Sequence, residues 1–231
     1  LLWYFGGKKY SEEDLVLFEQ NEPRILIRQI ISGKPPRIYA GYTEESLYFT
    51  QIGFGIISKK ESINNKYILV ILNSLLMNFY HKYMYLDLEK DLFQKILIAN
   101  CKKLPIKEIS LEDQQPFIEK ADKMLSLNKE LQEKVSSFQR LIARKFELEK
   151  LSTKLQDWYL LEFSEFIKEL KKSKIKLSLK EEMEWEEIFL EKKEEAEKVK
   201  NKIEITDKEI DRMVYELYGL NEEEIRIIEG D

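Results

Sequence analysis

Residues 205–225 read ITDKEIDRMVYELYGLNEEEI, a stretch that predicts a helix, a stop and a second helix. Thr206 and Glu209 have the spacing of a capping box, in which the threonine oxygen accepts a hydrogen bond from the backbone N–H three residues later. One apolar face follows at helical spacing, formed by Ile210, Met213, Val214 and Leu217. Gly219 can adopt the left-handed conformation that ends a helix, and Asn221 to Glu224 starts another helix. We therefore expect the C-terminal part of the chain to consist of capped helices.

The composition is that of a folded, helix-rich protein with much solvated surface. Of 231 residues, 43% are hydrophobic and 35% are charged, with eight Gly and five Pro. This length suits one large or two small domains. The single cysteine, Cys101, excludes a disulfide within the chain and fits a reducing compartment. With the single histidine, His81, it leaves too few ligands for a structural zinc site, so we expect no metal.

No sequence feature indicates a membrane. The apolar runs fall short of the roughly 20 residues that span a bilayer, and the opening segment 1–5 is too short for a signal peptide. Because the chain does not begin with Met, we expect it to be part of a longer polypeptide. We expect no membrane partner.

Charge is unevenly distributed along the chain. Residues 1–109 hold 15 Lys/Arg and 12 Asp/Glu, a net charge of +3, whereas residues 110–231 hold 23 and 31, a net charge of −8. An acidic balance argues against a general polyanion binder, because nonspecific DNA affinity depends on neutralising phosphates. The excess of cations in the first part still allows a local basic face there.

The first part reads as mixed strand and helix. Its short β-rich runs are separated by Gly, Pro and Ser turns and cover residues 24–31, 37–40, 47–50, 54–57 and 94–100. Asn64 or Asn65 is expected to cap a helix over 67–85 that is buried on more than one side. These elements predict a small mixed α/β domain over residues 1–109.

The second part, residues 110–231, reads as long helices. A cap at Ser110 opens the first, expected to reach about Leu151. Its apolar positions alternate in steps of four and three, typical of a coiled-coil seam, with polar Asn128 at one core position. The seam consists of Phe117, Ala121, Met124, Asn128, Leu131, Val135, Phe138 and Ile142. A capping box at Ser178 opens a helix to about Ile203, expected to return antiparallel. The predicted fold class is therefore α+β, with a helical spacer after the mixed domain.

No constellation in the sequence predicts catalysis. His81 lies in an apolar helix without an evident partner and is interpreted as a packing residue. The segments 33–34 and 53–55 lack the remaining residues of a phosphate loop or a dinucleotide motif. The triplet 169–171 has the spacing of part of a metal-dependent nuclease motif, but such triplets arise by chance in a chain this rich in Glu and Lys. We assign no catalytic residue.

Four passages carry a resemblance to a known family. NSLLMNFY at 73–80 resembles a helix of the TaqI-like C-terminal specificity domain, found in type II restriction–modification enzymes and adenine-N6 DNA methyltransferases. KKLP at 102–105 is similar to the turn that closes that domain, and QQPFI at 114–118 to the start of the helical spacer. The closing residues 205–225 also resemble the end of the specificity region. The resemblance extends over nearly the whole chain.

The resemblance implies a function and partners. It implies sequence-specific recognition of double-stranded DNA by residues 1–109, beside an upstream methyltransferase domain of the same polypeptide. That upstream part would bind S-adenosylmethionine, and Mg²⁺ if the enzyme also cleaves DNA; no cofactor is expected in these residues. Methylation requires the target base to leave the stack. The resemblance also implies a bacterial or archaeal, cytoplasmic protein.

Candidate DNA contacts come from early segments rich in cations and planar polar groups. Arg and Lys suit phosphates, while amide and guanidinium groups suit base edges. Arg24 and Arg28 are expected to share a strand face, with Lys34 on the adjoining turn. The candidate set is Arg24, Arg28, Gln29, Lys34, Arg37, Tyr39, Tyr42, Lys59, Lys60, Lys102 and Lys103. The alternative interpretation of each is an ordinary surface or packing residue.

Two other functions remain open from the sequence. The chain could be an interaction module whose coiled coil binds a protein or forms a homodimer, since Asn128 at a seam position can set register. A nuclease within this chain would instead require divalent metal. Affinity for DNA that falls with rising salt separates a DNA reader from an interaction module.

Overall fold

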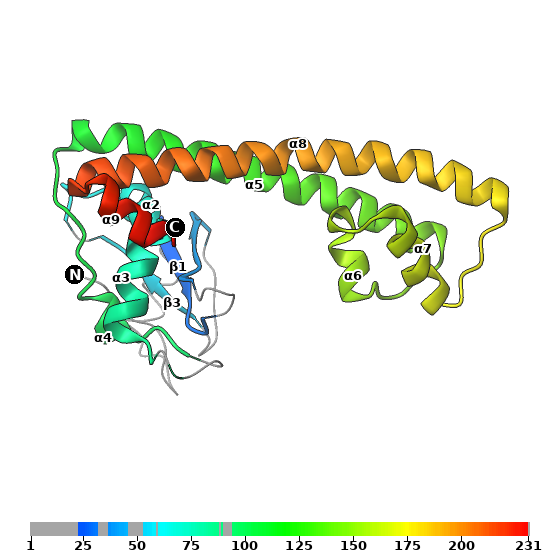
Figure 1. The fold of residues 1–231 in the computed structure, drawn as a ribbon, viewed down its shortest axis with the longest axis horizontal. Coiled ribbons are helices and arrows are strands. Elements are labelled where there is room, and N and C mark those ends of the chain that lie inside the picture. The colour runs from blue at the N-terminus through cyan, green and yellow to red at the C-terminus, as the bar shows by residue number, and fades with distance from the viewer. Residues whose placement is uncertain are drawn as a thin grey trace. The chain divides into compact units, whose positions relative to one another are not determined.

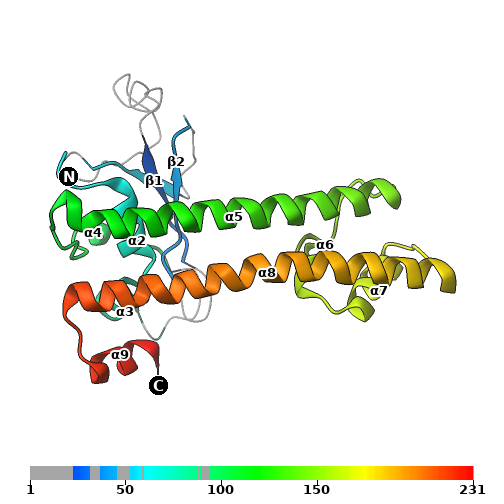
Figure 2. The ribbon, with the colours of Figure 1, turned by 90° about the horizontal axis from the view of Figure 1, so that it is seen from above.

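A computed structural model of the chain describes residues 23–31, 37–45, 53–58, 60–87, 89 and 94–230. They form two compact units, with unit 2 comprising Met124–Thr206 and unit 1 the parts of the chain before and after it. Unit 1 includes α9 (Glu222–Glu229) at the C-terminal end, which packs with α3 (Leu75–Tyr85). The division into domains at residue 109 stays a prediction. Figures 1 and 2 show the elements of both units.

Unit 1 contains an antiparallel three-stranded sheet. β1 (Arg24–Arg28) lies between β2 (Ala40–Thr43) and β3 (Gly53–Ile56). β1 and β3 confirm the β-rich runs predicted at 24–31 and 54–57, whereas β2 begins only at Ala40, the last residue of the run predicted at 37–40. The predicted strand 47–50 lies outside the described residues. The prediction for 94–100 was wrong: only Lys95 forms a bridge, to Ile30, and α4 (Ile98–Cys101) follows.

The predicted helix over 67–85 is two helices. α2 (Asn65–Asn73) is capped by Asn64, whose side chain accepts from the N–H of Lys66. Ser74 then ends α2 and caps α3, because its extended backbone breaks the helical path and its hydroxyl accepts from the N–H of Met77. His81 of α3 is buried, as the packing interpretation predicted, and burial lowers its pKa to about 4.

The two long helices are α5 (Leu111–Lys145) and α8 (Leu179–Tyr218). The caps predicted at Ser110 and Ser178 are confirmed, since each hydroxyl accepts from the N–H three residues later. Gly219 has φ +71° after α8, and Asn221 opens α9 with a capping box, so the predicted stop and restart are also confirmed. α5 ends before the predicted Leu151.

The capping box predicted at Thr206 is wrong. Thr206 is buried within α8, and its hydroxyl donates to the carbonyl of Lys202 at 2.8 Å. This bond to the preceding turn is the alternative that a threonine has inside a helix. No Gly or Pro separates Ile203 from Thr206, so the helix continues through the predicted start.

Unit 2 contains α6 (Thr153–Gln156), the 3₁₀ turn Trp158–Leu160, α7 (Phe163–Lys172) and parts of α5 and α8. α5 and α8 run antiparallel here as predicted, because Phe138 contacts Phe189 while the later Phe146 contacts the earlier Trp185. The aromatic core between these helices includes Phe138, Trp158, Phe166, Trp185 and Phe189. The α+β fold class is confirmed.

One seam position was predicted wrongly. Asn128 is exposed, and its side chain donates to the carbonyl of Met124 in its own helix. Leu127, one position earlier, is buried instead. Phe117, Ala121, Val135, Phe138 and Ile142 are buried as predicted. Asn128 therefore does not occupy a core position that would set the register of a coiled coil.

The described part of the chain contains neither a membrane-spanning helix nor a cluster of metal ligands. None of the helices found there has a stretch long and apolar enough to pass through a membrane. No group of three or more His, Cys, Asp or Glu side chains is arranged there to hold a metal ion. Neither finding assigns a function.

Candidate nucleic-acid interface

The two faces of the sheet differ in what covers them. Successive strand residues alternate between faces, and residues opposite each other in register share one. The face carrying Ile25, Ile27, Phe54 and Ile56 is buried and packs with α2. On the other face, register places Arg28 opposite Tyr39, and Leu26 opposite Gly41. Arg28, Tyr39 and Gly41 are exposed, so the part of the second face that carries these three residues, here called the Arg28 face, is accessible.

The segment that carries Tyr39 and leads into β2 is held by two asparagine side chains from the helices. Asn73 pairs twice with Ala40, accepting from its N–H at 3.2 Å and donating to its carbonyl at 3.0 Å. Asn78, which is buried, accepts from the N–H of Ile38 at 2.6 Å. The backbone of Arg28 donates to the carbonyl of Tyr39 at 3.1 Å. Hydrogen bonds therefore fix the chain on both sides of Tyr39, whose residue surface is 45% exposed.

This arrangement gives a physical role to the passage 73–80. Both of its asparagines, Asn73 and Asn78, satisfy backbone groups of residues near β2, the outer strand of the sheet. An outer strand otherwise presents unpaired N–H and C=O groups. The sequence showed only that the passage resembles a family motif. Its hydrogen-bond partners could not be predicted, because they lie 33 and 40 residues away in the chain.

Tyr42 does not lie with Tyr39. Three residues apart on one extended segment, they fall on opposite faces of the sheet, and the ammonium of Lys66 from α2 lies 5.2 Å from the centroid of the Tyr42 ring. Burial raises the pKa of Tyr42 to about 12, with a further contribution from Glu44. Tyr42 therefore lies beside α2, on the other face of the sheet from Tyr39.

Two of the predicted arginines, Arg24 and Arg37, are less accessible to a phosphate than Arg28. Arg24 does share the face of Arg28, as predicted, but it is only 2% exposed. Even spacing along a strand determines which face a residue occupies, but it does not determine whether that residue is buried. We therefore withdraw Arg24 from the interface. Arg37 is half-buried and close enough to the carboxylates of Asp207 and Asp211 to oppose the rise in their pKa values.

The remaining candidates are dispersed. The carbonyl of Gln29 accepts from the N–H of Ile96 at 2.9 Å, beside the end of β1. Lys60 forms an ion pair with Glu108, so its charge is already matched. Lys102 and Lys103 are exposed in the turn after α4. No described hydrogen bond or ion pair joins these lysines to the Arg28 face, and Lys34 and Lys59 lie outside the described residues.

A buried carboxylate that sequence reasoning missed helps to hold α3. The Oδ1 atom of Asp211 on α8 accepts from the N–H of Leu75, the first residue of α3, at 2.7 Å. An acidic side chain at a helix N-terminus is favoured by the exposed N–H groups and the helix dipole. Burial nevertheless raises the pKa of Asp211 to about 6, and Asp207 adds to this shift.

We expect Asp211→Asn to stabilise the protein at pH 7.5 by about 1–2 kcal/mol. A folded-state pKa above the ordinary value of 3.8 means that this group's favourable contribution is complete below pH 3.8 and is lost as pH rises through about 6. Asparagine retains the acceptor for Leu75 without the charge. Thermal unfolding should therefore show a higher midpoint than the wild type at pH 7.5 and little difference at pH 4.

The alanine variant supplies the control. Asp211→Ala removes both the charge and the acceptor for the N–H of Leu75, so it should unfold at a lower temperature than Asp211→Asn at both pH values. An Asp211→Asn midpoint equal to or below that of the wild type at pH 7.5 would contradict the expected pH dependence.

Two family models match separate parts of the chain. Residues 4–106 match the model of the TaqI-like C-terminal specificity domain, whose role is DNA sequence specificity in restriction–modification enzymes. Residues 110–214 match a second model, described as a domain of unknown function (DUF8810). No curated protein and no solved structure matches the chain. Residues 4–106, which include the sheet, α2, α3 and the Arg28 face, are therefore similar to the TaqI-like C-terminal specificity domains.

Proposed function

We propose that this chain reads a double-stranded DNA sequence for a site-specific adenine-N6 methyltransferase or a type II restriction–modification enzyme, and that the Arg28 face contacts the DNA. The observation that carries the proposal is the exposure of Arg28, Tyr39 and Gly41 on one face of a sheet within the specificity domain. Arginine forms two hydrogen bonds with a guanine edge or with a phosphate, and the absence of a side chain at Gly41 leaves room for close approach.

The hydrogen bonds from Asn73 and Asn78 support the same assignment. A side chain that discriminates between bases must be held in position before the DNA arrives, because ordering it on binding costs affinity. Here the backbone that carries Tyr39 is bonded to residues of α2 and α3. Methyl transfer, with S-adenosylmethionine as donor, would belong to the methyltransferase part of the enzyme, and we assign no residue of this chain to it.

The proposal is tested by selection and binding with the 231-residue chain. Duplexes with a randomised window are enriched on the protein, and the affinity for the selected duplex is measured by fluorescence anisotropy at several salt concentrations. We expect enrichment of a defined sequence. Arg28→Ala should weaken binding about 5- to 30-fold, as expected for loss of about 1–2 kcal/mol from one arginine contact.

A matched arginine variant controls for loss of charge. Arg226 in α9 is exposed and pairs only at 3.8 Å with Glu222, so Arg226→Ala should bind the selected duplex like the wild type. The proposed function fails if no sequence is enriched. If a sequence is enriched but Arg28→Ala and Arg226→Ala bind equally, the Arg28 face is not the contact surface.

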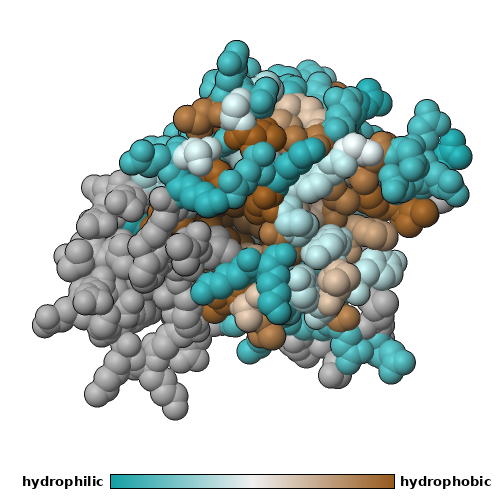
Figure 3. All heavy atoms as spheres, turned by 90° about the vertical axis from the view of Figure 1, so that its left-hand side faces the viewer, coloured by the Kyte–Doolittle hydropathy of each residue, from teal (hydrophilic) through white to brown (hydrophobic). Residues whose placement is uncertain are grey.

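A second function, contact with another protein, is favoured by an apolar surface of unit 1. A hollow of about 320 Å³ lies between α3 and α9 and is lined by Leu76, Phe79, Tyr80, Tyr83, Met84, Leu220, Glu224, Ile227 and Ile228. Tyr83, Met84 and Ile227 are each more than half exposed. Figure 3 shows apolar side chains exposed on one face of this unit. Such surfaces are typical of protein contacts, and the methyltransferase part of the enzyme is the partner that we propose.

A further inference from the structure

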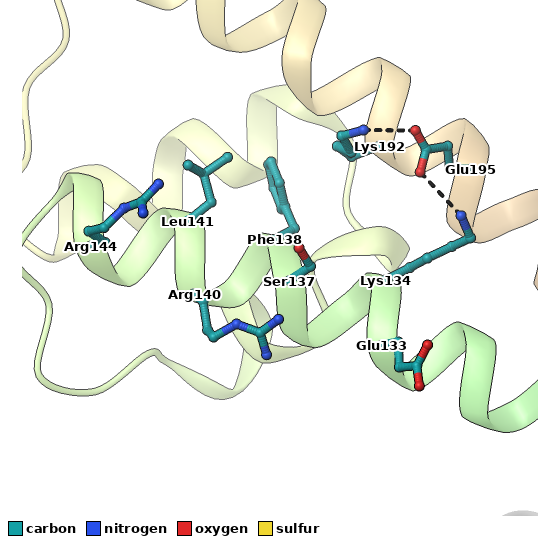
Figure 4. Close-up of a pocket in the computed structure, with 9 residues that line it drawn as sticks. All are labelled: Glu133, Lys134, Ser137, Phe138, Arg140, Leu141, Arg144, Lys192 and Glu195. Atoms are coloured by element: carbon teal, nitrogen blue, oxygen red, sulfur yellow. Dashed lines mark hydrogen bonds and ion pairs between the residues drawn. The ribbon is translucent and has the colours of Figure 1, made fainter.

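Unit 2 has a basic hollow that the specificity domain does not include. It has a volume of about 930 Å³ and lies beside α5 and α8 within this unit. Figure 4 shows Arg140, Arg144 and Ser137 on α5 together with Lys192 and Glu195 of α8. Four cationic side chains and two carboxylates line the hollow, an excess of positive charge in the part of the chain whose overall balance is acidic.

The lysines of this hollow are already paired with a carboxylate. Glu195 accepts from Lys192 at 2.7 Å and from Lys134 at 3.3 Å, as the dashed lines in Figure 4 show. These ion pairs lower the pKa of Glu195, with Lys192 as the main cause, and keep it charged. Glu195 is therefore not available to neutralise further cations of the hollow.

The two arginines are different. Among the described residues, neither Arg140 nor Arg144 has a carboxylate within 4.0 Å, although lysines of α8 such as Lys180 and Lys198 have partners one turn away. Arg140 and Arg144 are four residues apart, so their like charges lie on one side of the helix and destabilise it slightly. An anion bound between them would remove this repulsion.

The chemistry of the pair suits a phosphodiester backbone. Guanidinium groups form paired hydrogen bonds with phosphate oxygens, and the backbone positions of Arg140 and Arg144 are about 6 Å apart along the helix axis, four residues at a rise of about 1.5 Å. The hydroxyl of Ser137, one turn before Arg140, adds a donor on the same side. A row of donors along one side of a helix fits successive phosphates of one strand better than a single small anion.

We propose that Arg140 and Arg144 bind phosphates of double-stranded DNA independently of its sequence, as a second contact surface apart from the Arg28 face. This proposal rests on the proposed function in so far as the chain must bind a duplex. Base contacts are not expected from this surface, because phosphate contacts carry no sequence information. It would increase affinity for every duplex to the same extent.

The test uses the 231-residue chain and a long duplex of mixed sequence, with binding measured at several salt concentrations. We expect Arg140→Ala/Arg144→Ala to weaken binding about tenfold or more and to reduce the slope of log affinity against log salt by about 2, one for each phosphate that is no longer bound. The control is Lys180→Ala/Lys198→Ala, which removes the same charge from paired, exposed lysines of the same unit.

Three outcomes separate the proposals. Equal affinity and equal salt slope in the two double variants would overturn the phosphate contact. A loss in the arginine variant that varied with duplex sequence would also overturn it. Absence of any sequence preference in the wild type would refute the proposed reading function, while a specific loss in the arginine variant would still support the phosphate contact. Circular dichroism before each titration verifies that both double variants are folded.

Discussion

Trp158→Ala is expected to lower the free energy of unfolding by about 3–5 kcal/mol, the usual cost of removing a large aromatic side chain from a core. Trp158 is fully buried in unit 2, with its ring centroid 4.3 Å from that of Phe138 and 6.0 Å from that of Phe189. Its indole N–H donates to the carbonyl of Val135 at 3.2 Å. The ring therefore joins the turn after α6 to both long helices, and alanine would leave a cavity among them.

The measurement is urea unfolding followed by circular dichroism. Leu160→Ala is the matched control, because Leu160 belongs to the same 3₁₀ turn but is 56% exposed; this control should change the midpoint little. Trp158→Phe should fall between the two, since it retains most of the ring volume and loses the bond to Val135. If Trp158→Ala and Leu160→Ala unfolded at the same midpoint, Trp158 would not be a central residue of this core.

The sequence correctly predicted those helix ends whose hydrogen-bond partners are neighbouring residues. The caps at Ser110 and Ser178 and the stop at Gly219 involve partners within a few positions, so the sequence contained all the necessary information. Thr206 shows the limit of this reasoning. Its spacing to Glu209 permits a cap, but a threonine hydroxyl can equally bond to the preceding turn, as it does with Lys202. The absence of a helix breaker before Thr206 was the signal that could have decided between them.

The candidate interface could be predicted only in part, because strand alternation depends on local sequence whereas burial does not. Alternation along a strand correctly put Arg24 and Arg28 on one face, but burial depends on what covers each end of that face, and only Arg28 is exposed. Tyr39 and Tyr42 were grouped because they are close in the chain, although strand geometry separates them. The asparagine contacts to Ile38 and Ala40 could not be inferred, because they join segments far apart in sequence. The contact residues themselves remain a prediction.

The second large effect concerns Gln114, the first residue of the QQPFI passage. Its side chain is fully buried in unit 1 and joins three backbone groups. The amide donates to the carbonyls of Ser62 at 2.7 Å and Ile109 at 3.0 Å, and its oxygen accepts from the N–H of Asn64 at 2.9 Å. One side chain of α5 thus holds the residues that begin α2, the helix that bears Asn73.

We expect Gln114→Leu to destabilise the protein by about 3 kcal/mol. Leucine is of similar size, so the main effect is to leave buried backbone groups without partners, each at a cost of about 1–3 kcal/mol, less the gain from burying an apolar group. The expected result is a clear loss in the urea midpoint. Binding to the selected duplex should also weaken near the unfolding temperature. The reason is that α2, whose Asn73 holds Ala40 beside Tyr39, would lose the hydrogen bonds that fix its N-terminal end.

Two further variants show whether the hydrogen bonds are responsible. Gln115→Leu changes the neighbouring, exposed glutamine and should leave the midpoint nearly unchanged. Gln114→Glu retains an acceptor for Asn64 but, when ionised, loses both donors and places a charge against the carbonyls of Ser62 and Ile109. It should therefore be as destabilising as leucine at pH 7.5 and recover part of the loss at pH 4, where protonation restores one donor. A Gln114→Leu protein as stable as Gln115→Leu would show that these bonds contribute little, and that Phe117 packing against Tyr67, with ring centroids 5.4 Å apart, is what joins α5 to α2.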